Sequence, residues 1–337
     1  MNFLFFGASV CEQTTKHDTG EVTGFVNVLQ DLCDRYRLDV SINRVTAGSC
    51  SIGDAGIALV DDVVKCKPDV CFVEWCTPAP SDSRAVDCEA IYSKLIENDI
   101  LPVTLVLPRR DRDQRLTQVY SDCKTIADHF KLPFIDLSQK YSLRLLEHLL
   151  RDVVHTNSLG ANVYAHELFS SILNLKKNSQ PVKNYMRPNI NFHNIYYDMQ
   201  KYKNRVKNIY LEFDYDTDHV EQVIVFMEQR IGPWSRRCRT ELDFGETTRE
   251  GSLDMFDAWS WRERQCIKPL TTWFDLDSTS NSVSLRIISE PCVLNGFNSE
   301  QARIGNFSNI PHEIRPKGRL IIVSTTKHIK IKNVGVS

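Results

Sequence analysis

Three polar residues of the chain, Ser9, Asp152 and His155, have the types that serine-dependent ester chemistry requires. A serine hydroxyl becomes a nucleophile when an imidazole takes its proton, and a carboxylate holds that imidazole in the correct tautomer. Ser9 directly follows an apolar run in FLFFGAS, and Asp152 and His155 lie three residues apart ahead of a helical pattern. We therefore predict Ser9 as the nucleophile, His155 as the base and Asp152 as the residue that orients it.

Acyl chemistry also needs N–H donors for the oxyanion that forms on the carbonyl oxygen. The backbone N–H groups of Ser9 and Gly48 are the expected donors, because a glycine lets the main chain approach a substrate closely. Gly48 lies in the stretch Thr46-Ala47-Gly48-Ser49, after the second apolar run.

The elements that must position these residues follow from the alternation of apolar runs and helical patterns over residues 1–175. Apolar runs predict strands over 3–6, 40–45, 70–75, 103–107 and 134–135. Helical spacing predicts helices over 24–36, 52–65, 84–98, 116–130 and 161–173. Strands that are apolar on both faces indicate a parallel sheet covered by helices, so we predict a three-layer α/β domain. The carboxyl ends of its strands share one edge, where ligands bind.

Gly7-Ala8-Ser9 after the first strand, Gly48 after the second and Asp152-x-x-His155 before the last helix together resemble the SGNH (GDSL-type) hydrolase family. The resemblance covers residues 1–175 and implies a flavodoxin-like catalytic domain over residues 1–178 with a five-stranded parallel sheet. It also implies esterase or acyltransferase activity that requires no metal and no cofactor. For a transferase, acetyl-CoA is the acyl donor to consider.

The sequence departs from the family pattern at two places. Ala8 stands where the family usually has an aspartate, which is not the triad acid. The stretch Val73–Thr77 lacks the asparagine whose side chain usually donates to the oxyanion. Either Thr77 or another loop supplies this donor, or the site has only two backbone donors.

Residues that follow the third and fourth strands are the expected substrate-binding residues. These are Glu74 and Trp75 after the third strand and Arg109 after the fourth. Arg109 would bind an anionic group such as a carboxylate or phosphate, or it belongs to a solvated charged turn.

Two other nucleophiles are less well placed. Ser51 lies in Ser49-Cys50-Ser51-Ile52-Gly53, which resembles a nucleophile elbow, but its first position is not glycine and it follows only the second strand. Cys11 has no neighbouring cationic group in the sequence to lower its thiol pKa, so we expect an inert thiol.

The second half of the chain has a different pattern. A polar segment from Leu175 to Pro181 resembles a linker, and period-two alternation then predicts strands over 207–213, 219–226, 282–288 and 319–324. We predict a mainly β domain over residues 179–337, of the sandwich or jelly-roll kind, with carbohydrate binding as its candidate role. Trp259 and Trp261 would stack on sugar rings or belong to the core.

The composition of the chain limits the kinds of partner and the location that we expect for the protein. A formal net charge of −2 gives no basic excess for nucleic-acid binding. The apolar run at the start is too short for a membrane span or a signal peptide. Eleven cysteines without a CxxC pair indicate reduced thiols in the cytoplasm and no zinc site.

These observations predict a serine enzyme that handles acyl esters, with O-acetyl groups on a carbohydrate as the expected substrate. The motifs do not separate an esterase from an O-acetyltransferase, because the two differ only in the acceptor that reaches the acyl-enzyme. A cytoplasmic location favours transfer during polysaccharide or glycoconjugate biosynthesis. The alternative is a catalytically weak SGNH-like protein that acts as a carbohydrate-binding or scaffolding module.

Overall fold

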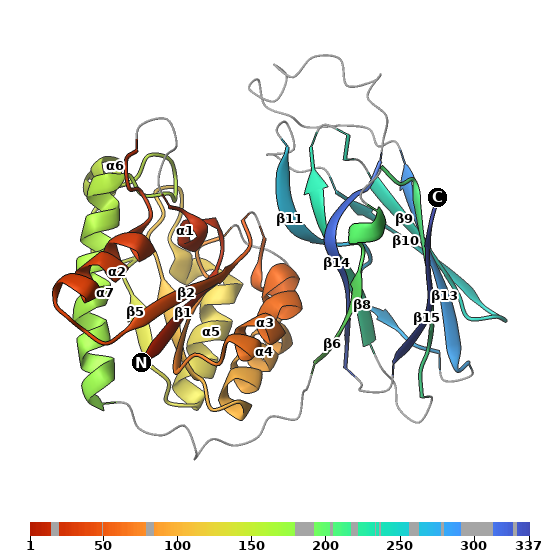
Figure 1. Cartoon of the computed structure of the whole chain (residues 1–337), viewed down its shortest axis with the longest axis horizontal. Coiled ribbons are helices and arrows are strands. Elements are labelled where there is room, and N and C mark those ends of the chain that lie inside the picture. Colours follow the sequence, from red (N-terminus) through yellow and green to blue (C-terminus); the bar gives the residue numbers. More distant parts are fainter. Residues whose placement is uncertain are drawn as a thin grey trace. The chain divides into compact units, whose positions relative to one another are not determined.

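The chain forms two compact units, Met1–Asn191 and Phe192–Ser337, in the computed structural model (Figure 1). The structure describes residues 1–14, 20–48, 50–78, 84–178, 192–202, 205–216, 222–232, 234–235, 237–255, 263–277, 280–290, 313–325 and 329–337. We predicted the domain boundary after residue 178, and residues 179–191 lie outside the described residues. Trp259 and Trp261 lie outside them as well.

The first unit contains a five-stranded sheet in which every pair of neighbouring strands is parallel. Its strands are β1 (Asn2–Gly7), β2 (Ser41–Thr46), β3 (Val70–Glu74), β4 (Leu101–Val106) and β5 (Phe134–Asp136). The order β2-β1-β3-β4-β5 is that of flavodoxin-like sheets and confirms the predicted fold class. The order reverses at β1, so the ends of β1 and β3 flank the position where ligands bind in such sheets.

Helices cover both faces of this sheet, as the apolar strands require. Figure 1 shows α2 (Phe25–Arg35) and α7 (Ser158–Asn178) on one side, and α3 (Ile57–Cys66), α4 (Ala85–Glu97) and α5 (Gln118–His129) on the other. A π-helical turn, Ile52–Gly56, precedes α3, and a 3₁₀ turn, Gln114–Leu116, precedes α5. All five predicted helices are therefore present. Two short helices were not predicted: α1 (Ser9–Glu12) and α6 (Leu143–Leu149).

The second unit is an antiparallel β-sandwich, which confirms the predicted class. One sheet has the order β10-β9-β13-β7-β15 and the other has the order β11-β8-β14-β6, with β12 paired to β8. The strands are β6 (His193–Asp198), β7 (Asn208–Asp214), β8 (Gln222–Ile231), β9 (Arg237–Asp243), β10 (Thr248–Asp254), β11 (Arg264–Pro269), β12 (Phe274–Asp275), β13 (Ser282–Glu290), β14 (Arg315–Ser324) and β15 (Lys330–Val336). Inward side chains of both sheets, such as Phe213, Val225 and Leu285, form one hydrophobic core.

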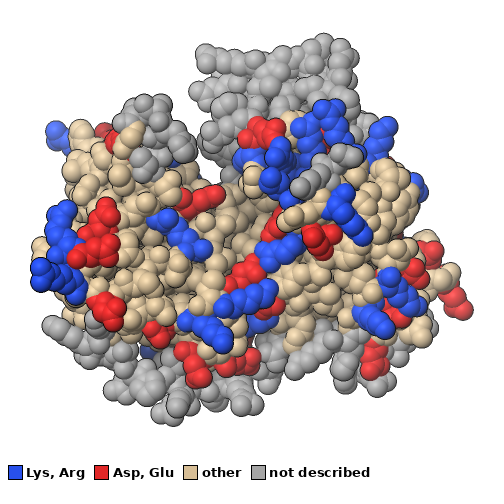
Figure 2. All heavy atoms as spheres, in the orientation of Figure 1, with Lys and Arg blue, Asp and Glu red and all other residues tan. Residues whose placement is uncertain are grey.

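The surface agrees with the near-zero net charge. On the face that Figure 2 shows, acidic and basic side chains are interspersed over both units. Among the described residues, no helix combines the length and the apolar character that a membrane span requires.

Candidate active site

The structure brings Ser9, His155 and Asp152 into one hydrogen-bonded chain. Ser9 begins α1 directly after β1, while the other two residues lie in the segment between α6 and α7. His155 Nε2 lies 2.9 Å from Ser9 Oγ, and His155 Nδ1 lies 2.8 Å from Asp152 Oδ2. The two partners of the imidazole thus lie on opposite ring nitrogens, as the transfer of a proton from a serine requires.

The Asp152 carboxylate is held in its charged form. Burial would raise its pKa, but hydrogen bonds from the His155 side chain and from the backbone N–H groups of His155 and Val154 hold that pKa well below its usual range. The two N–H groups donate to Asp152 Oδ1 over 2.8 and 2.9 Å. An ionised Asp152 therefore accepts from Nδ1 and leaves Nε2 free to take a proton from Ser9.

Backbone and side-chain hydrogen bonds hold the segment that carries His155. The Arg151 N–H donates to the His155 carbonyl over 2.9 Å, and the Arg110 N–H donates to the Val153 carbonyl over 3.0 Å. Gln13 Nε2 donates to the Thr156 carbonyl over 2.7 Å and to the Thr23 carbonyl over 2.8 Å. Gln13 thereby ties the residues just after the serine to the residue just after the histidine.

Gln13 was not predicted as part of the site. Its position four residues after Ser9, at the end of the α1 turn, is the only pattern that could have drawn attention to it. A single glutamine carries no motif, so its partners appear only when the chain is folded.

Gly48 lies beside Ser9, as predicted. A Cβ atom at Gly48 would lie 3.5 Å from Ser9 Cβ and 2.8 Å from Glu12 Oε2, so a side chain here would require the Glu12 carboxylate to move. The Ser9 N–H, at the first position of α1, has no partner within its helix. The two backbone N–H groups that we predicted as oxyanion donors therefore belong to Ser9 and to a residue beside it.

Glu12 is a further residue of the site that we did not predict. Its carboxylate accepts a hydrogen bond from the Gly48 N–H. Desolvation raises the pKa of Glu12, and the Gly48 hydrogen bond and the nearby His155 partly offset this rise. In this structure the carboxylate uses the donor that an oxyanion would need.

Glu74 does not line a substrate site, which corrects our prediction. Its side chain is fully buried beneath the Ser9 turn, where it accepts hydrogen bonds from the Ala8 N–H over 3.4 Å and from the Thr77 hydroxyl. Burial raises the pKa of Glu74 to about 8, and these hydrogen bonds limit the rise. The carboxyl beneath this turn thus comes from the end of β3.

Thr77 is also placed differently from our expectation. The residue is buried and its hydroxyl donates to Glu74, so the hydroxyl is already committed. Its carbonyl accepts from Arg109 Nη1 over 2.7 Å. Thr77 therefore holds Glu74 beneath the Ser9 turn, and its hydroxyl is not available to an oxyanion.

Trp75 and Arg109 correct two further substrate-binding predictions. Trp75 is 1% exposed and packs edge-on against Phe6 at a centroid distance of 5.3 Å, because it extends a strand that is buried on both faces. Arg109 forms a two-pronged ion pair with Asp111, both contacts being 2.7 Å, in addition to its bond to Thr77. With its side chain 8% exposed, Arg109 links the loops after β3 and β4 and offers no free cation.

The two competing nucleophiles have structural roles. The Ser51 side chain is buried and its hydroxyl donates to Asp54 over 2.8 Å at the start of the π-helical turn. Burial raises the pKa of Cys11, and the nearby Glu74 raises it further, which agrees with an inert thiol. All ten cysteines that the structure describes are free thiols.

Among the described residues, no three His, Cys, Asp or Glu side chains lie close enough together to hold a metal ion. What the arrangement can do is acyl transfer, since it contains a serine hydroxyl, an oriented imidazole, an ionised carboxylate and two main-chain donors.

This two-domain fold, a flavodoxin-like parallel-sheet domain followed by a β-sandwich, is also found in a solved esterase. The chain is similar to the crystal structure of a two-domain esterase, CEX, active on acetylated mannans. The identity is 12%, the TM-score is 0.60, and the match covers 97% of this chain and 92% of that chain. The same esterase co-crystallized with mannopentaose matches with 13% identity and a TM-score of 0.63, over 97% of this chain and 91% of that chain.

The likeness covers both domains and is visible in the structure alone. No protein-family model matches the sequence, and no curated protein sequence matches it either. At 12–13% identity, the likeness establishes the two-domain fold.

Proposed function

We propose that the protein is a serine esterase that removes O-acetyl groups from a carbohydrate. The observation that carries this proposal is the continuous chain from Ser9 Oγ through the His155 ring to Asp152, with contacts of 2.9 and 2.8 Å. The activity of the structurally similar esterase on acetylated mannans supports an acetylated polysaccharide as the substrate class.

The first half of the reaction forms an acetyl-enzyme. Ser9 Oγ attacks the ester carbonyl carbon while His155 Nε2 takes the hydroxyl proton, and Asp152 stabilises the resulting imidazolium. The tetrahedral oxyanion is bound by the Ser9 and Gly48 N–H groups after Glu12 has moved off Gly48. His155 then returns the proton to the sugar oxygen as the bond between carbonyl carbon and sugar oxygen breaks.

The second half returns the free enzyme. A water molecule attacks the acetyl carbonyl and gives its proton to His155, which passes it to Ser9 Oγ as acetate leaves. Transfer to a sugar hydroxyl in place of water would follow the same steps. We propose hydrolysis as the main reaction, because it is the reaction of the similar structure and needs no second binding site.

Release of p-nitrophenol from p-nitrophenyl acetate, and of acetate from acetylated mannan and xylan, tests this function. We expect the Ser9→Ala variant to lose at least about 10³-fold in kcat. Ser51→Ala is the matched control, because Ser51 is a serine of the same domain whose hydroxyl donates to Asp54. Equal rates for the wild-type protein and Ser9→Ala would refute the proposed nucleophile.

The acceptor is tested in the same reactions. Addition of acetyl-CoA and deacetylated glycans, followed by mass spectrometry of the glycans, detects transfer. A gain of acetyl groups that Ser9→Ala abolishes would replace the esterase proposal with an O-acetyltransferase.

A further inference from the structure

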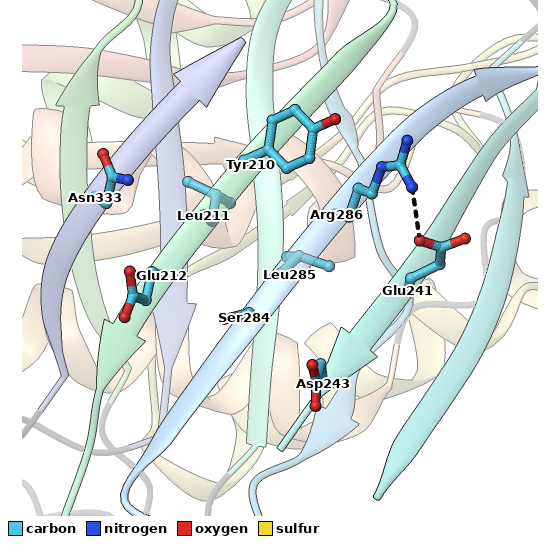
Figure 3. Close-up of a pocket in the computed structure, with 9 residues that line it drawn as sticks. All are labelled: Tyr210, Leu211, Glu212, Glu241, Asp243, Ser284, Leu285, Arg286 and Asn333. Carbon is cyan, nitrogen blue, oxygen red and sulfur yellow. Dashed lines mark hydrogen bonds and ion pairs between the residues drawn. The ribbon is translucent and has the colours of Figure 1, made fainter. Parts of the chain in front are cut away.

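The outer face of the sheet β10-β9-β13-β7-β15 carries an open pocket of about 320 Å³ (Figure 3). Four adjacent strands of the second unit line it. The side chains that reach it come from outward positions, namely Tyr210, Glu212, Asp243, Ser284, Arg286 and Asn333. Leu211 and Leu285, between them, point into the hydrophobic core. The pocket therefore lies on a rigid floor of four hydrogen-bonded strands.

Strand register orders these side chains in two rows. Arg286 pairs with Tyr210 on one side and with Glu241 on the other. In the next row, Ser284 pairs with Glu212 on one side and with Asp243 on the other. Because serine is small, the second row has two carboxylates separated by one low position, about 10 Å apart along the hydrogen-bonding direction.

Tyr210 supplies an aromatic surface at one end of the pocket. The residue is 39% exposed, and the Arg286 guanidinium lies over its ring at 5.5 Å from the centroid. On the other side, Tyr210 pairs with Gly335 of β15, which has no side chain to cover the ring. Arg286 also forms an ion pair with Glu241 at 3.4 Å, which fixes the guanidinium.

A β-bulge in β15 brings Asn333 to this pocket. The pairing of β15 with β7 shifts between Ile331 and Asn333, so that Asn333 rather than Lys332 lies opposite Glu212. Bulges of this kind redirect side chains and are common beside functional sites. The result is a side-chain amide next to a carboxylate on the open face.

The polar groups of the second row have unused hydrogen-bonding capacity. Within the described part of the chain, the side chains of Glu212, Ser284 and Asn333 make no hydrogen bond. The carboxylates disfavour an anionic ligand, and the cation of the pocket, Arg286, is already paired with Glu241. A ligand that donates hydroxyl hydrogens to carboxylates and places an apolar face on a tyrosine ring fits this lining, and an uncharged sugar chain has both properties.

We propose that this pocket is a glycan-binding site for an uncharged oligosaccharide segment of the polymeric substrate. A sugar ring stacks on Tyr210, and hydroxyl groups of the chain donate to Glu212 and Asp243 and accept from the Asn333 amide. The link to a polymeric substrate rests on the proposed function, whereas binding itself requires no residue of the Ser9 site.

Calorimetric titration of the full-length Ser9→Ala protein with mannopentaose, xylopentaose and maltopentaose tests the site. We expect at least one of these to bind, and Tyr210→Ala in the same background to weaken that binding about tenfold or more, because stacking and ring burial are lost. Glu212→Ala removes a hydroxyl acceptor without touching the ring, and we expect a loss of the same order. With Ser9 intact, both variants should hydrolyse p-nitrophenyl acetate at the wild-type rate.

Tyr196→Ala is the matched control, because Arg319 lies over the Tyr196 ring at 5.0 Å but Tyr196 belongs to β6 of the other sheet. Thermal melts of all variants show whether they are folded. Absence of binding by every pentasaccharide, or binding that folded Tyr210→Ala and Glu212→Ala leave unchanged, would overturn the proposal. So would tighter binding of pentalysine than of any sugar, which would mark a cationic partner.

The experiments can refute the esterase function and the glycan-binding pocket independently of each other. Sugar binding without ester hydrolysis would retain this site and refute the esterase, while hydrolysis without Tyr210-dependent binding would do the reverse.

Discussion

Three carboxyl groups near Ser9 lie in different environments. Asp152 is kept ionised by three hydrogen bonds and orients the imidazole. Glu74 lies buried beneath the turn, where its raised pKa of about 8 keeps it neutral at neutral pH. Glu12 lies against Gly48, at the position where the oxyanion would form. The environment of each group, not its residue type, decides which form it takes.

Glu12 should limit the rate of ester cleavage. Its carboxylate accepts a hydrogen bond from the Gly48 N–H and places a negative charge close to the position where the transition state develops its own negative charge. Removal of the carboxylate should therefore stabilise the oxyanion. We expect Glu12→Ala to raise kcat/KM for p-nitrophenyl acetate by about tenfold, which corresponds to about 1.4 kcal/mol. Glu97→Ala, on the exposed last turn of α4, is the control. A rate for Glu12→Ala equal to or below the wild-type rate would contradict this role.

Glu74 should make stability depend on pH. Its folded-state pKa of about 8 lies above its ordinary value of 4.5, so between these values the folded protein binds more protons than the unfolded chain. The contribution of Glu74 is therefore fully present below pH 4.5 and is lost as the pH rises through about 8. The loss is on the order of 5 kcal/mol in the free energy of unfolding.

Urea unfolding of the wild-type protein and Glu74→Gln at pH 5 and pH 9 measures this effect. The glutamine does not titrate, so the stability difference between the two proteins should shift in favour of Glu74→Gln at the higher pH. A difference that is the same at both pH values would show that Glu74 does not titrate as described.

At the element scale, the loop between α6 and α7 positions the imidazole because it is closely packed. Gly160, in the first turn of α7, lies so close to α6 that a Cβ atom there would be 2.0 Å from the Leu149 carbonyl oxygen. Asn157 connects the same two helices, because its Nδ2 donates to the His148 carbonyl over 2.8 Å and its Oδ1 accepts from the Gly160 N–H over 2.9 Å. The start of α7 thus sets the path of the chain through His155.

Gly160→Ala should therefore damage both stability and activity. The new methyl group would meet main-chain atoms, which cannot move away as a side chain can, and we expect a loss of about 1–3 kcal/mol in the free energy of unfolding. A displaced loop would also lengthen the contact between His155 and Ser9, so kcat should fall. Gly56→Ala is the matched control, since its nearest new neighbour is the flexible end of Ile91 at 3.1 Å. Chemical denaturation and ester hydrolysis of both variants give the comparison.

The two units of the molecule place their polar side chains in different ways. The parallel sheet of the first unit gathers loops at one edge and forms a site from residues far apart in the chain, such as Ser9 and His155. The antiparallel sheet of the second unit presents a broad face whose outward side chains are free of the core, such as Tyr210 and Glu212. We propose ester hydrolysis as the function of the first unit and glycan binding as the function of the open face of the second.

Much of the fold was predictable because its pattern is strong. Strands such as β1 and β3 are apolar on both faces and short, which identifies a covered parallel sheet. In the second unit, four strands were predicted and the others were missed. β10, with the sequence TREGSLD, lies at the edge of its sheet and buries little, so its alternation is faint. Edge strands need fewer apolar residues, and a pattern based on burial misses them.

The types and the order of the site residues could be predicted from the chain before its folded structure was known. Ser9 and Gly48 follow the first two predicted strands, and parallel strands bring such positions to one edge. Asp152 and His155 precede the last predicted helix. Tertiary structure decided which neighbouring side chains face outward. Glu74 ends β3, while Trp75 and Arg109 follow β3 and β4, yet these side chains point into the protein or pair with other residues.

Position along a strand fixes where the backbone lies, whereas the burial and the partners of a side chain depend on contacts between distant segments. The carboxyl beneath Ser9 comes from β3, and the amide that ties Thr156 to the turn comes from Gln13. Likewise, only the register of four strands places Tyr210, Glu212 and Asp243 around one pocket. No local pattern encodes such pairings, because each depends on residues that are dozens of positions apart.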